Sequence, residues 1–434
     1  MALGGGTFIA QNKVLAGAYI NFVSVAKASA NLGERGIAAI GLDLDWGNDT
    51  DIIEVTNEDF QKETMKIFGY SYADDKMKGL RDLFRNVTKL YVYRLNKTTV
   101  KASCTYANAK FGGTRGNDLK IVIQANVDDS SKFDVFTYLG TTQIDAQTVA
   151  DATELVNNDF VDFITTATLQ VEAGVALTGG TNGTVDSSSH QTFLDKIETY
   201  SSINALGCLA DNSAIKNLYV AFTKRMRDEV GSKFQLVIHG VAADYEGVVN
   251  VKNTVSDGDA SDLVYWVLGV IAGTAVNASC TNKVYDGEFT VNTNYKQSEL
   301  IAAIEAGEFV LHQVSETVRI LEDINSLVTV TDVRGEDFKS NQTIRVLDQI
   351  ATDIASLFVT KYLGIVPNDA AGRTSLWADI VKHHKTLQDI RAIENFSDAD
   401  VSVSAGDNKK SVVVSDYVTV VNAMEKLYMT VFVQ

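Results

Sequence analysis

The first hundred residues combine two hydrophobic patterns, one typical of β-strands and one of amphipathic helices. Strict alternation of apolar and polar residues predicts a strand, whereas apolar residues repeated every three or four positions predict a helix. The segments that satisfy these rules are strands at 18–25, 36–42 and 89–95 and helices at 57–68 and 76–87. We expect the first helix to open at an Asn57 cap. This part of the chain therefore predicts a mixed α/β unit.

Between residues 99 and 180 the pattern changes to short alternating runs that are separated by turns. The runs that predict strands lie at 119–127, 132–139, 142–149 and 160–164. One helix is expected near 149–156. Short strands at this spacing are typical of a small antiparallel sandwich. The glycine-rich stretch at 177–183 closes this segment, which we predict to be an inserted β-sandwich.

Strand and helix patterns alternate again between residues 181 and 331. Strands are expected at 205–209, 234–239, 248–251 and 309–314, and helices at 190–200, at 213–230 and around Trp266. This rhythm predicts parallel βαβ units with right-handed crossovers and with helices on both faces of the sheet.

The remaining segment begins with two amphipathic helices. The apolar residues at helical spacing are Ile344, Leu347, Ile350, Ile354 and Leu357 in the first and Leu376, Ile380, Leu387 and Ile390 in the second. A hairpin is expected next, with Val401 and Val403 before a turn at 406–408 and the run 412–414 after it. This part predicts an α+β domain.

The last eight residues, Leu427 to Gln434, alternate in the manner of a strand, with bulky β-favouring side chains on both faces. A hydrophobic strand at an exposed sheet edge invites uncontrolled pairing. We therefore expect this strand either to pair within its own domain or to join a sheet of another subunit.

Composition excludes several functional classes. A chain of 434 residues is long enough for about three domains. Its 38 basic and 55 acidic residues give a net charge of -17, which argues against direct binding to nucleic acid by phosphate neutralisation. The first six residues lack the basic and apolar regions of a secretory signal, so no export is expected. The longest apolar run, 263–278, falls short of the ~20 residues of a membrane span and predicts a buried helix.

No arrangement of residues predicts a catalytic, cofactor or metal site. The three cysteines, Cys104, Cys208 and Cys280, are widely spaced and are expected to be buried small hydrophobes. The adjacent His383 and His384 would point about a quarter turn or more apart on a helix, so joint metal binding is not expected. The glycine-rich stretches lack the Lys-Ser/Thr ending of a phosphate-binding loop, and there is no GxSxG serine motif.

Two pairs of carboxylates are candidates for acid/base chemistry, Asp43 with Asp45 and Asp286 with Glu288. Carboxylates in a stretch between a strand and a turn are more often solvated turn residues than catalytic groups. We therefore predict that the chain is not an enzyme.

Several segments together resemble the tail sheath proteins of contractile phage tails, R-type bacteriocins and related contractile injection particles. They are Gly33 to Ile40 (GERGIAAI), Phe111 to Leu119 (FGGTRGNDL), Leu177 to Gly183 (LTGGTNG), Ser279 to Glu288 (SCTNKVYDGE), Ile324 to Leu327 (INSL) and Met424 to Val431 (MEKLYMTV). Their order and spacing carry the resemblance. The chain departs from the family at Ala16 to Ile20, where members often have a Pro-Gly-Val-Tyr-like start.

The resemblance implies a central subtilisin-like α/β domain without protease activity, an antiparallel β-sandwich and a C-terminal α+β domain that faces an inner tube. It also implies N- and C-terminal arms that exchange strands between subunits. The expected divisions are an N-terminal arm at 1–25, an α/β segment at 26–98 that packs with the core, the sandwich at 99–180, the central domain at 181–331 and the C-terminal domain at 332–434, with its arm strand at 427–434.

The function implied is a structural sheath that polymerises helically around a tail tube and contracts to drive the tube through a cell envelope. The implied partners are other copies in stacked rings, the tail tube protein, and baseplate and tail terminator proteins, without cofactor and without direct contact with nucleic acid or membrane. Assembly is expected in the bacterial cytoplasm. Both a virion tail and a released bacteriocin-like particle remain open as the final location.

Two sets of residues are candidates for assembly contacts. Those for strand exchange are Ala18, Tyr19, Ile20 and Phe22 near the start and Leu427, Tyr428, Met429, Val431, Phe432 and Val433 near the end. Those for contact with the tube are Arg373, Lys382, Lys385 and Arg391, all on a helix expected at 373–394.

Two alternatives belong to other functional classes. A surface-layer protein or adhesin would also assemble with itself, but it is expected to carry an export signal. An α/β hydrolase-like enzyme would need a nucleophile and a base in one pocket, and no motif supplies them.

Overall fold

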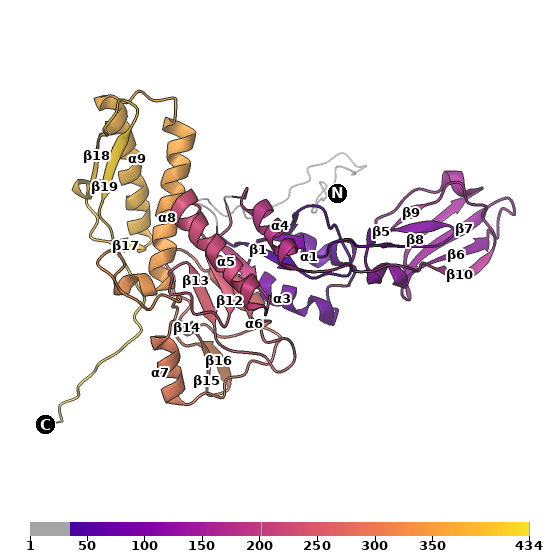
Figure 1. Ribbon diagram of the computed structural model, residues 1–434, viewed down its shortest axis with the longest axis horizontal. Coiled ribbons are helices and arrows are strands. Elements are labelled where there is room, and N and C mark those ends of the chain that lie inside the picture. Colours follow the sequence, from indigo (N-terminus) through magenta and orange to yellow (C-terminus); the bar gives the residue numbers. More distant parts are fainter. Residues whose placement is uncertain (1–34, 201, 434) are drawn as a thin grey trace, which may run out of the picture.

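The computed structural model describes residues 35–200 and 202–433. A domain built around an open sheet lies in the middle, a β-sandwich extends from one end, and the C-terminal domain with its long helices stands at the other (Figure 1). The predicted strand at 18–25 lies outside the described residues. The mixed α+β multidomain architecture is confirmed.

The central sheet has seven strands in the order β14-β13-β12-β11-β1-β3-β2, all parallel except β2. They are β1 Ile37–Leu42, β2 Ile53–Thr56, β3 Lys89–Arg94, β11 Ala205–Cys208, β12 Gln235–His239, β13 Val248–Val251 and β14 Glu308–Phe309. Three of these strands come from residues 35–95 and four from the segment after the sandwich. The two segments of the chain therefore share a single sheet.

Helices cover both faces of the sheet, as predicted. Alternate residues of β1 enter two separate cores, Ala38 and Ile40 on one face and Ala39 on the other. The first core contains α3 Lys78–Phe84 and α6 Leu263–Gly273. The second contains α4 Ser187–Ile197 and α5 Ser213–Arg225, which continues as the π-turn η4 Met226–Val230. A further helix, α7, spans Gln297–Glu305.

The first part of the apolar run at 263–278 forms the buried helix α6, as expected. Small residues let this helix lie directly against the backbone of the last turn of α3 and of the residues after it. A Cβ atom on Gly269 would lie 2.6 Å from the Leu83 carbonyl oxygen, and one on Gly273 would overlap the Asn86 carbonyl oxygen. Any larger side chain at these two positions would force the helices apart. Among the described residues no helix is long and apolar enough to cross a bilayer.

The sandwich consists of a four-stranded and a three-stranded antiparallel sheet. The strands of the first are β6 Leu119–Ala125, β7 Phe133–Leu139, β8 Thr142–Val149 and β10 Glu172–Ala176. Those of the second are β4 Lys101–Ser103, β5 Ala107–Gly112 and β9 Val161–Phe163. The predicted helix near 149–156 is wrong, because only the 3-10 turn η3 Ala152–Glu154 forms there, capped by Asp151.

Two other predictions need correction. The helix at 57–68 is broken into α1 Asn57–Lys62 and α2 Thr64–Phe68, and its cap is Thr56, whose side chain accepts from the Asp59 amide. The strand at 309–314 divides at Val310: β14 joins the central sheet, whereas β15 Leu311–Val314 pairs with β16 Thr317–Ile320. The second boundary is decided by a partner distant in sequence, because β14 pairs with β13.

The C-terminal domain contains two helices and a hairpin, as predicted. Its elements are α8 Asn341–Leu357, extended by the π-turn η6 Phe358–Tyr362, then α9 Ala370–Asp389, β17 Ile393–Glu394, β18 Val401–Ala405, β19 Val412–Asp416 and β20 Thr419–Val420. The hairpin pairs β18 with β19, and β17 pairs with β20.

The three cysteines are free thiols. Cys208 and Cys280 are buried, and burial raises the pKa of the Cys208 thiol to about 12. Cys104 is half-buried and packs against the sandwich core. The first two serve as small core residues, as expected.

A paired ribbon, an inserted side chain and several hydrogen bonds join the sandwich to the central domain, among them that from Arg94 to the Gly112 carbonyl oxygen. Residues 97–103 and 178–184 run antiparallel, with bridges from Lys97 to Thr184 and from Ser103 to Thr178. Trp46, in the loop after β1, is fully buried in the sandwich core, where its ring lies 5.4 Å from that of Phe111. Its indole nitrogen donates to the Lys66 carbonyl oxygen over 3.1 Å. The indole therefore fixes the sandwich against the central domain.

Replacing Trp46 by alanine should lower the free energy of unfolding by about 3–5 kcal/mol, because it leaves a cavity where the two domains meet. Tyr428→Ala is the control, since this ring is 90% exposed and its loss should leave stability unchanged. Chemical denaturation followed by circular dichroism measures both. Equal stability of the two variants would show that Trp46 does not fix the sandwich.

Candidate functional site

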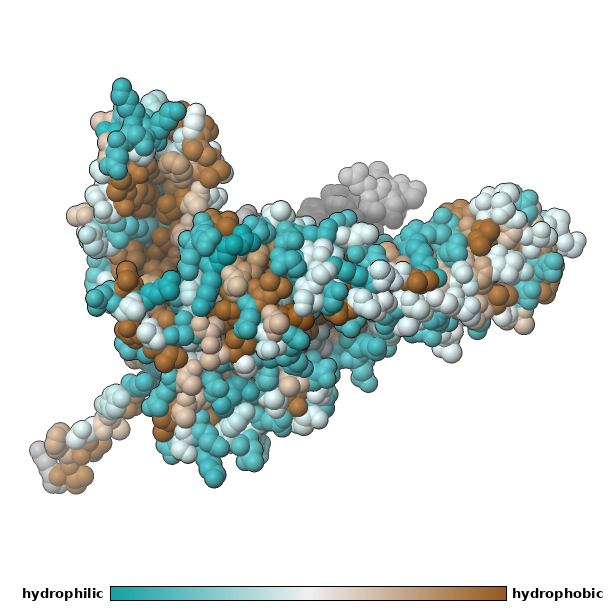
Figure 2. All heavy atoms as spheres, in the orientation of Figure 1, coloured by the Kyte–Doolittle hydropathy of each residue, from teal (hydrophilic) through white to brown (hydrophobic). Residues whose placement is uncertain are grey.

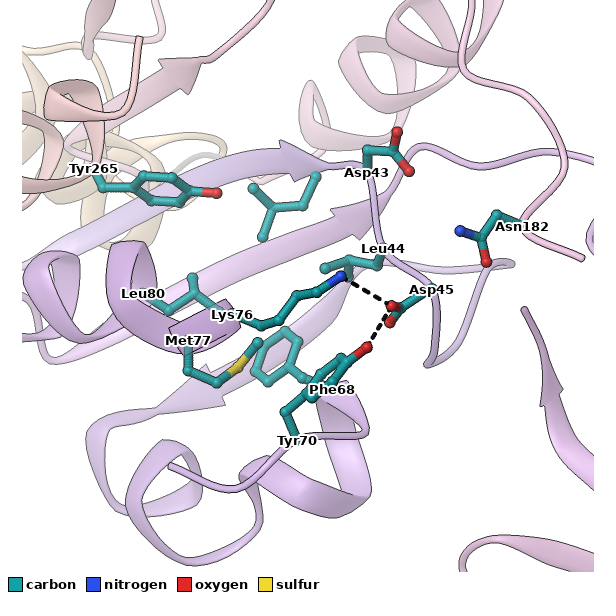
Figure 3. Close-up of a pocket in the computed structure, with 11 residues that line it drawn as sticks. Asp43, Leu44, Asp45, Phe68, Tyr70, Lys76, Met77, Leu80, Asn182 and Tyr265 are labelled. Carbon is teal, nitrogen blue, oxygen red and sulfur yellow. Dashed lines mark hydrogen bonds and ion pairs between the residues drawn. The ribbon is translucent and has the colours of Figure 1, made fainter. Parts of the chain in front are cut away.

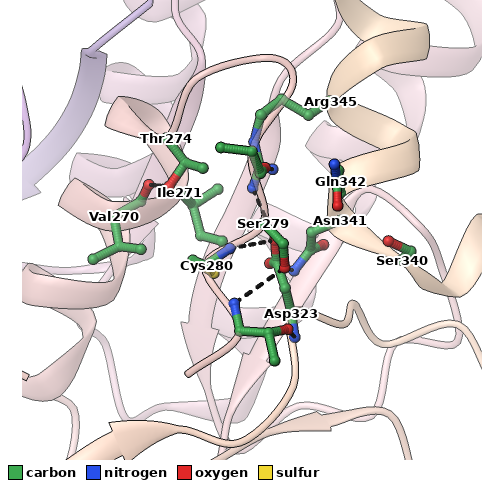
Figure 4. A network of polar contacts seen from close by, with 12 residues as sticks. Val270, Ile271, Thr274, Ser279, Cys280, Asp323, Ser340, Asn341, Gln342 and Arg345 are labelled. Carbon is green, nitrogen blue, oxygen red and sulfur yellow. Dashed lines mark hydrogen bonds and ion pairs between the residues drawn. The ribbon is translucent and has the colours of Figure 1, made fainter. Parts of the chain in front are cut away.

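The first half of α8 buries polar side chains against the central domain. Asn341, Gln342, Thr343 and Arg345 are each less than 5% exposed. Because a buried polar group is costly without a partner, these residues are expected to be hydrogen-bonded. The Arg345 guanidinium donates to the Ala278 carbonyl oxygen over 2.7 Å and lies 3.3 Å from a carboxylate oxygen of Asp323 (Figure 4).

Asp323 is the common acceptor in this network. It accepts from the Asn341 side chain over 3.0 Å and from the Cys280 amide over 3.1 Å. Its ion pair with Arg345 is essentially closed to solvent, with side-chain exposures of 1% and 0%. Three segments of the chain therefore meet at one carboxylate: the segment before α7, the segment after β16, and α8.

A second buried ion pair holds α8 one turn further along. Asp348 accepts from both terminal nitrogens of Arg227, in η4, over 2.6 and 2.8 Å. Burial alone lowers the pKa of Arg227, but the adjacent Asp348 carboxylate outweighs it and the pKa is raised. Two oxygens that face two nitrogens fix the orientation of α8 as well as its distance.

The same half of α8 also anchors the segment that leads to the C-terminal arm. The Gln342 side chain donates to the Val421 carbonyl oxygen over 3.1 Å and accepts from the Ala423 amide over 3.0 Å. Thr281 then donates to Glu425 over 2.7 Å. The chain thus leaves the folded body at a defined point beside α8.

Beyond this point the arm is exposed and extends away from the body (Figures 1 and 2). Its apolar side chains are 70–93% exposed: Leu427, Tyr428, Met429, Val431, Phe432 and Val433. The strand predicted at 427–434 does not form over residues 427–433, which pair with none of the sheets in the described part of the chain. The arm therefore combines apolar side chains with a backbone that no described strand pairs.

The other candidates for strand exchange, Ala18, Tyr19, Ile20 and Phe22, lie outside the described residues.

The carboxylates weighed as acid/base groups have structural partners. Asp45 lines a cavity of about 340 Å³ at the end of β1, where it accepts from the Tyr70 hydroxyl over 2.5 Å and lies 3.3 Å from the Lys76 amine (Figure 3). Asp43 points away from that pair and accepts from Asn96 over 2.6 Å. The polar groups of the cavity are therefore engaged with one another, Asp45 with both Tyr70 and Lys76.

The carboxylates of the second pair also have structural partners. Asp286 accepts from the Trp266 indole over 2.8 Å, and Glu288 forms a two-pronged ion pair with Arg81. No group of three or more His, Cys, Asp or Glu side chains in residues 35–200 and 202–433 is arranged to hold a metal ion.

Comparison with known proteins gives four consecutive family matches. They are the tail sheath protein Gp18 domain III N-terminal region over residues 35–95, the phage tail sheath protein beta-sandwich domain over 96–182, the phage tail sheath protein central domain over 183–326 and the phage tail sheath C-terminal domain over 333–434. The chain belongs to the phage tail sheath protein family.

Two similar proteins match over nearly their whole length. The phage-like element PBSX protein XkdK of Bacillus subtilis (strain 168) is 32% identical over 468 residues, with 99% of each chain covered. The crystal structure of the sheath tail protein from Desulfitobacterium hafniense is 35% identical, with a TM-score of 0.83 and coverage of 95% of this chain and 99% of that one.

A more distant structure shares the sheath fold alone. The helical sheath of the anti-feeding prophage in its contracted state is 12% identical, with a TM-score of 0.59 and coverage of 97% of this chain and 99% of that one.

The four candidates for tube contact do not form one patch on this sheath protein. Lys382 and Lys385 are exposed and lie three residues apart on α9, which places them on the same side. Arg373 is half-buried and bonds to Asn368, and it lies nine residues before Lys382, about half a turn away around the helix. Arg391 follows the end of α9 with a φ of 61°. Only the two lysines are brought together.

Hydrophobic periodicity does not reveal the buried polar face of α8. A helix with Asn, Gln, Thr and Arg in its first turns is expected to expose them. Their burial depends on partners elsewhere in the sequence, such as Asp323 for Arg345. Such a pairing has no local signature, and the same is true of Arg227 with Asp348.

Removing Asp323 should be far more damaging than removing an exposed acid nearby. Asp323→Ala leaves the buried Arg345 without its counter-ion and should cost about 3–5 kcal/mol. Glu336→Ala removes an ion pair with Lys339 whose acid is 74% exposed and should cost less than about 1 kcal/mol. Urea unfolding measures both, and a similar small loss for each would contradict the role given to Asp323.

Proposed function

We propose that this chain is the subunit of a contractile tail sheath that polymerises helically around a tail tube and shortens to drive the tube through a cell envelope. The observation that carries the proposal is the exposed apolar arm at 427–433, which leaves a sheath-family body at a fixed point. An arm of this kind is suited to pair with a neighbouring copy.

Strand donation between identical subunits explains a helical assembly. A contact between two different surfaces of the same protein, repeated with a rotation and a rise that do not close, builds a tube. Each ladder hydrogen bond contributes about 0.5–1.5 kcal/mol, and burial of the arm's apolar side chains adds to this. With about four such bonds, one exchange contributes several kcal/mol, and many copies multiply it.

The acceptor we propose is an edge of the C-terminal domain's sheet in the next subunit. The hairpin β18–β19 is a two-stranded sheet, so within the described residues each strand has one side without a partner strand. Val413 and Val414 on β19 are 51% and 38% exposed, which offers apolar contacts to an arriving strand.

Contraction in this scheme is a move between two packings of one folded unit and needs no nucleotide. The ion pairs of Arg345 and Arg227 favour movement of the central and C-terminal domains as one body. The arm at 427–433 is then the connection that keeps neighbours joined while the bodies rotate.

The further features proposed for this subunit follow from the family and from the divisions predicted above. The central domain is subtilisin-like and has no protease activity, and the C-terminal domain faces the tube through Lys382 and Lys385. Partners are the tail tube, baseplate and tail terminator proteins, with no cofactor and no direct nucleic acid or membrane contact. Assembly takes place in the bacterial cytoplasm, and the product is a virion tail or a bacteriocin-like particle.

Loss of the arm should abolish tubes and leave the subunit folded. In the described part of the segment, residues 427–433, the deletion of 427–434 removes only exposed residues. The circular dichroism spectrum and the thermal unfolding of the subunit should therefore be unchanged. Negative-stain microscopy should show striated tubes for the intact chain and separate particles for the truncated one. Normal tubes from the truncated chain would exclude strand exchange through this arm.

A single charge provides a matched comparison. Val431→Asp places a carboxylate in the arm, whereas Val127→Asp makes the same change at a 96% exposed valine of the sandwich. Burial of an unpaired carboxylate opposes assembly only in the first case. Tube yield should fall severalfold for Val431→Asp and remain normal for Val127→Asp.

Reversal of the two neighbouring lysines tests the tube-facing surface. The double change Lys382→Glu and Lys385→Glu should weaken co-sedimentation with tube protein, because it reverses the charge of one exposed side of α9. Lys409→Glu with Lys410→Glu gives the same change of charge on the exposed hairpin turn. If both pairs bind tube protein equally, α9 does not face the tube.

A further inference from the structure

The core of the C-terminal domain is incompletely covered beside the hairpin. In the register of β18 with β19, Val401 and Val403 share a face with Val414, and Val401 is buried in the core of the domain. Val414 therefore lies on the core-facing side of the hairpin, yet it is 38% exposed. Among the described residues no further strand lies next to β19 to cover it. This edge of the core has room for one more strand.

The open edge of the core faces α8 and its continuation η6. Val412, the first residue of β19, lines the same cavity as Phe358 of η6. At the other end of β19, Asp416 contacts His384 of α9, next to the histidine that contacts Asp353 of α8. We call the space between residues 412–416 and 350–358 the hairpin groove. Figure 2 shows the apolar hollow that it forms on the C-terminal domain.

The walls of the hairpin groove are apolar side chains that are only partly buried. Those of α8 and η6 recur at helical spacing on one side of the helix. They are Ile350, Ile354, Leu357 and Phe358. The groove therefore suits an uncharged, apolar strand.

A cavity of about 100 Å³ lies at the η6 end of the hairpin groove. A closed cavity of about 150 Å³ holds a whole benzene molecule, so this open one has room for most of a phenyl ring. Its apolar lining consists of Phe358, Tyr362, Leu363, Val366, Leu376 and Val412. Arg373 and Asn368 also line it, and they bond to each other.

The arm at 427–433 has the spacing that this groove requires. In an extended chain Tyr428 and Phe432 lie on one side, four residues apart. On β19, Val412 at the cavity and the exposed Asp416 are also on one side and four residues apart. A strand paired with β19 therefore places one ring at the cavity and the other beside the carboxylate.

The chemistry of the two rings selects the direction of the arm. A phenol hydroxyl without a partner is costly in an apolar cavity, whereas the Phe432 ring has no polar group to satisfy. Beside Asp416, the Tyr428 hydroxyl has a carboxylate that can accept its hydrogen bond. Phe432 opposite Val412 and Tyr428 opposite Asp416 correspond to antiparallel pairing.

We propose that the arm of a second copy lies in the hairpin groove as a strand antiparallel to β19, anchored by Phe432 in the cavity. Thr430 then lies opposite Val414 and covers it. The donor is a second copy, because the arm of the same chain extends away from this groove (Figure 1). The assignment rests on the proposed function and adds to it the register and the anchoring side chain.

Disulfide trapping in assembled tubes of the full chain tests the register. In a Cys104→Ser background, Thr430→Cys with Val414→Cys should link neighbouring copies, because opposed residues of antiparallel strands have Cα atoms about 4.5–5.5 Å apart, within disulfide reach. Oxidised tubes should give a covalent ladder on a non-reducing gel. Thr430→Cys with Val413→Cys is the matched control, since Val413 points to the opposite face of β19, and trapping should fall about tenfold.

Equal trapping by the two pairs, or none by either, would overturn the register. A disulfide confined to one chain would show that each arm occupies its own groove. These results leave the proposed function standing as long as deletion of residues 427–434 abolishes tubes. Normal tubes after that deletion would instead contradict strand exchange itself.

Replacement of the anchor gives a second test that needs no cross-link. Phe432→Ala should raise the subunit concentration needed for tubes by about tenfold or more, because it leaves the cavity empty. Met429→Ala, on the opposite side of the arm, should raise it by less than about threefold. Phe432 and Met429 are 87% and 74% exposed in the subunit, so neither change should affect folding. Equal effects of the two variants would overturn the role of Phe432.

Discussion

The buried polar side of α8 is the contact on which the arrangement of the central domain, the C-terminal domain and the arm depends. Desolvation of two ions offsets much of their attraction, so buried pairs such as Arg345 with Asp323 contribute less to net stability than to geometry. Their value is directional, because a displaced helix would leave a charge unpaired in the protein interior. The same helix turn holds the chain at Val421 and Ala423 through Gln342. One helix therefore sets where the C-terminal domain stands and where the arm begins.

The acids that a search for acid/base chemistry selects have structural partners in the described part of the chain. They are Asp45, Asp286 and Glu288, and each is engaged by a hydroxyl, an indole or a guanidinium of its own domain. In this protein these acids hold loops at the carboxyl edge of the sheet and beside α6. An enzyme of similar architecture could use acids at such positions.

Much of the fold was predictable from sequence, because its signals are local. The apolar strand at 234–239 and the apolar helix around Trp266 need no knowledge of their partners to be recognised. A prediction failed where a distant partner decides the outcome, because Val310 divides a strand between two sheets. The pairing of Arg227 with a residue more than a hundred positions later has no local signal that could have predicted it. The arm was identified by its alternating pattern, but its lack of a partner strand among the described residues is a property of the assembled domains. Likewise, His383 and His384 each contact an acid from another element, Asp353 on α8 and Asp416 on β19, and adjacency on a helix argued only against a metal site.

The paired ribbon between residues 97–103 and 178–184 has a consequence for how this protein tolerates change. Entry and exit of the sandwich lie side by side, so the chain leaves the central sheet and returns to it at nearly the same place. An insertion or deletion within the outer loops of the sandwich therefore leaves the spacing of β3 and α4 unaltered. The outer loops of the sandwich can therefore vary in size and surface, or carry an added domain, without altering the sheet, whereas its core stays tied to the central domain through Trp46.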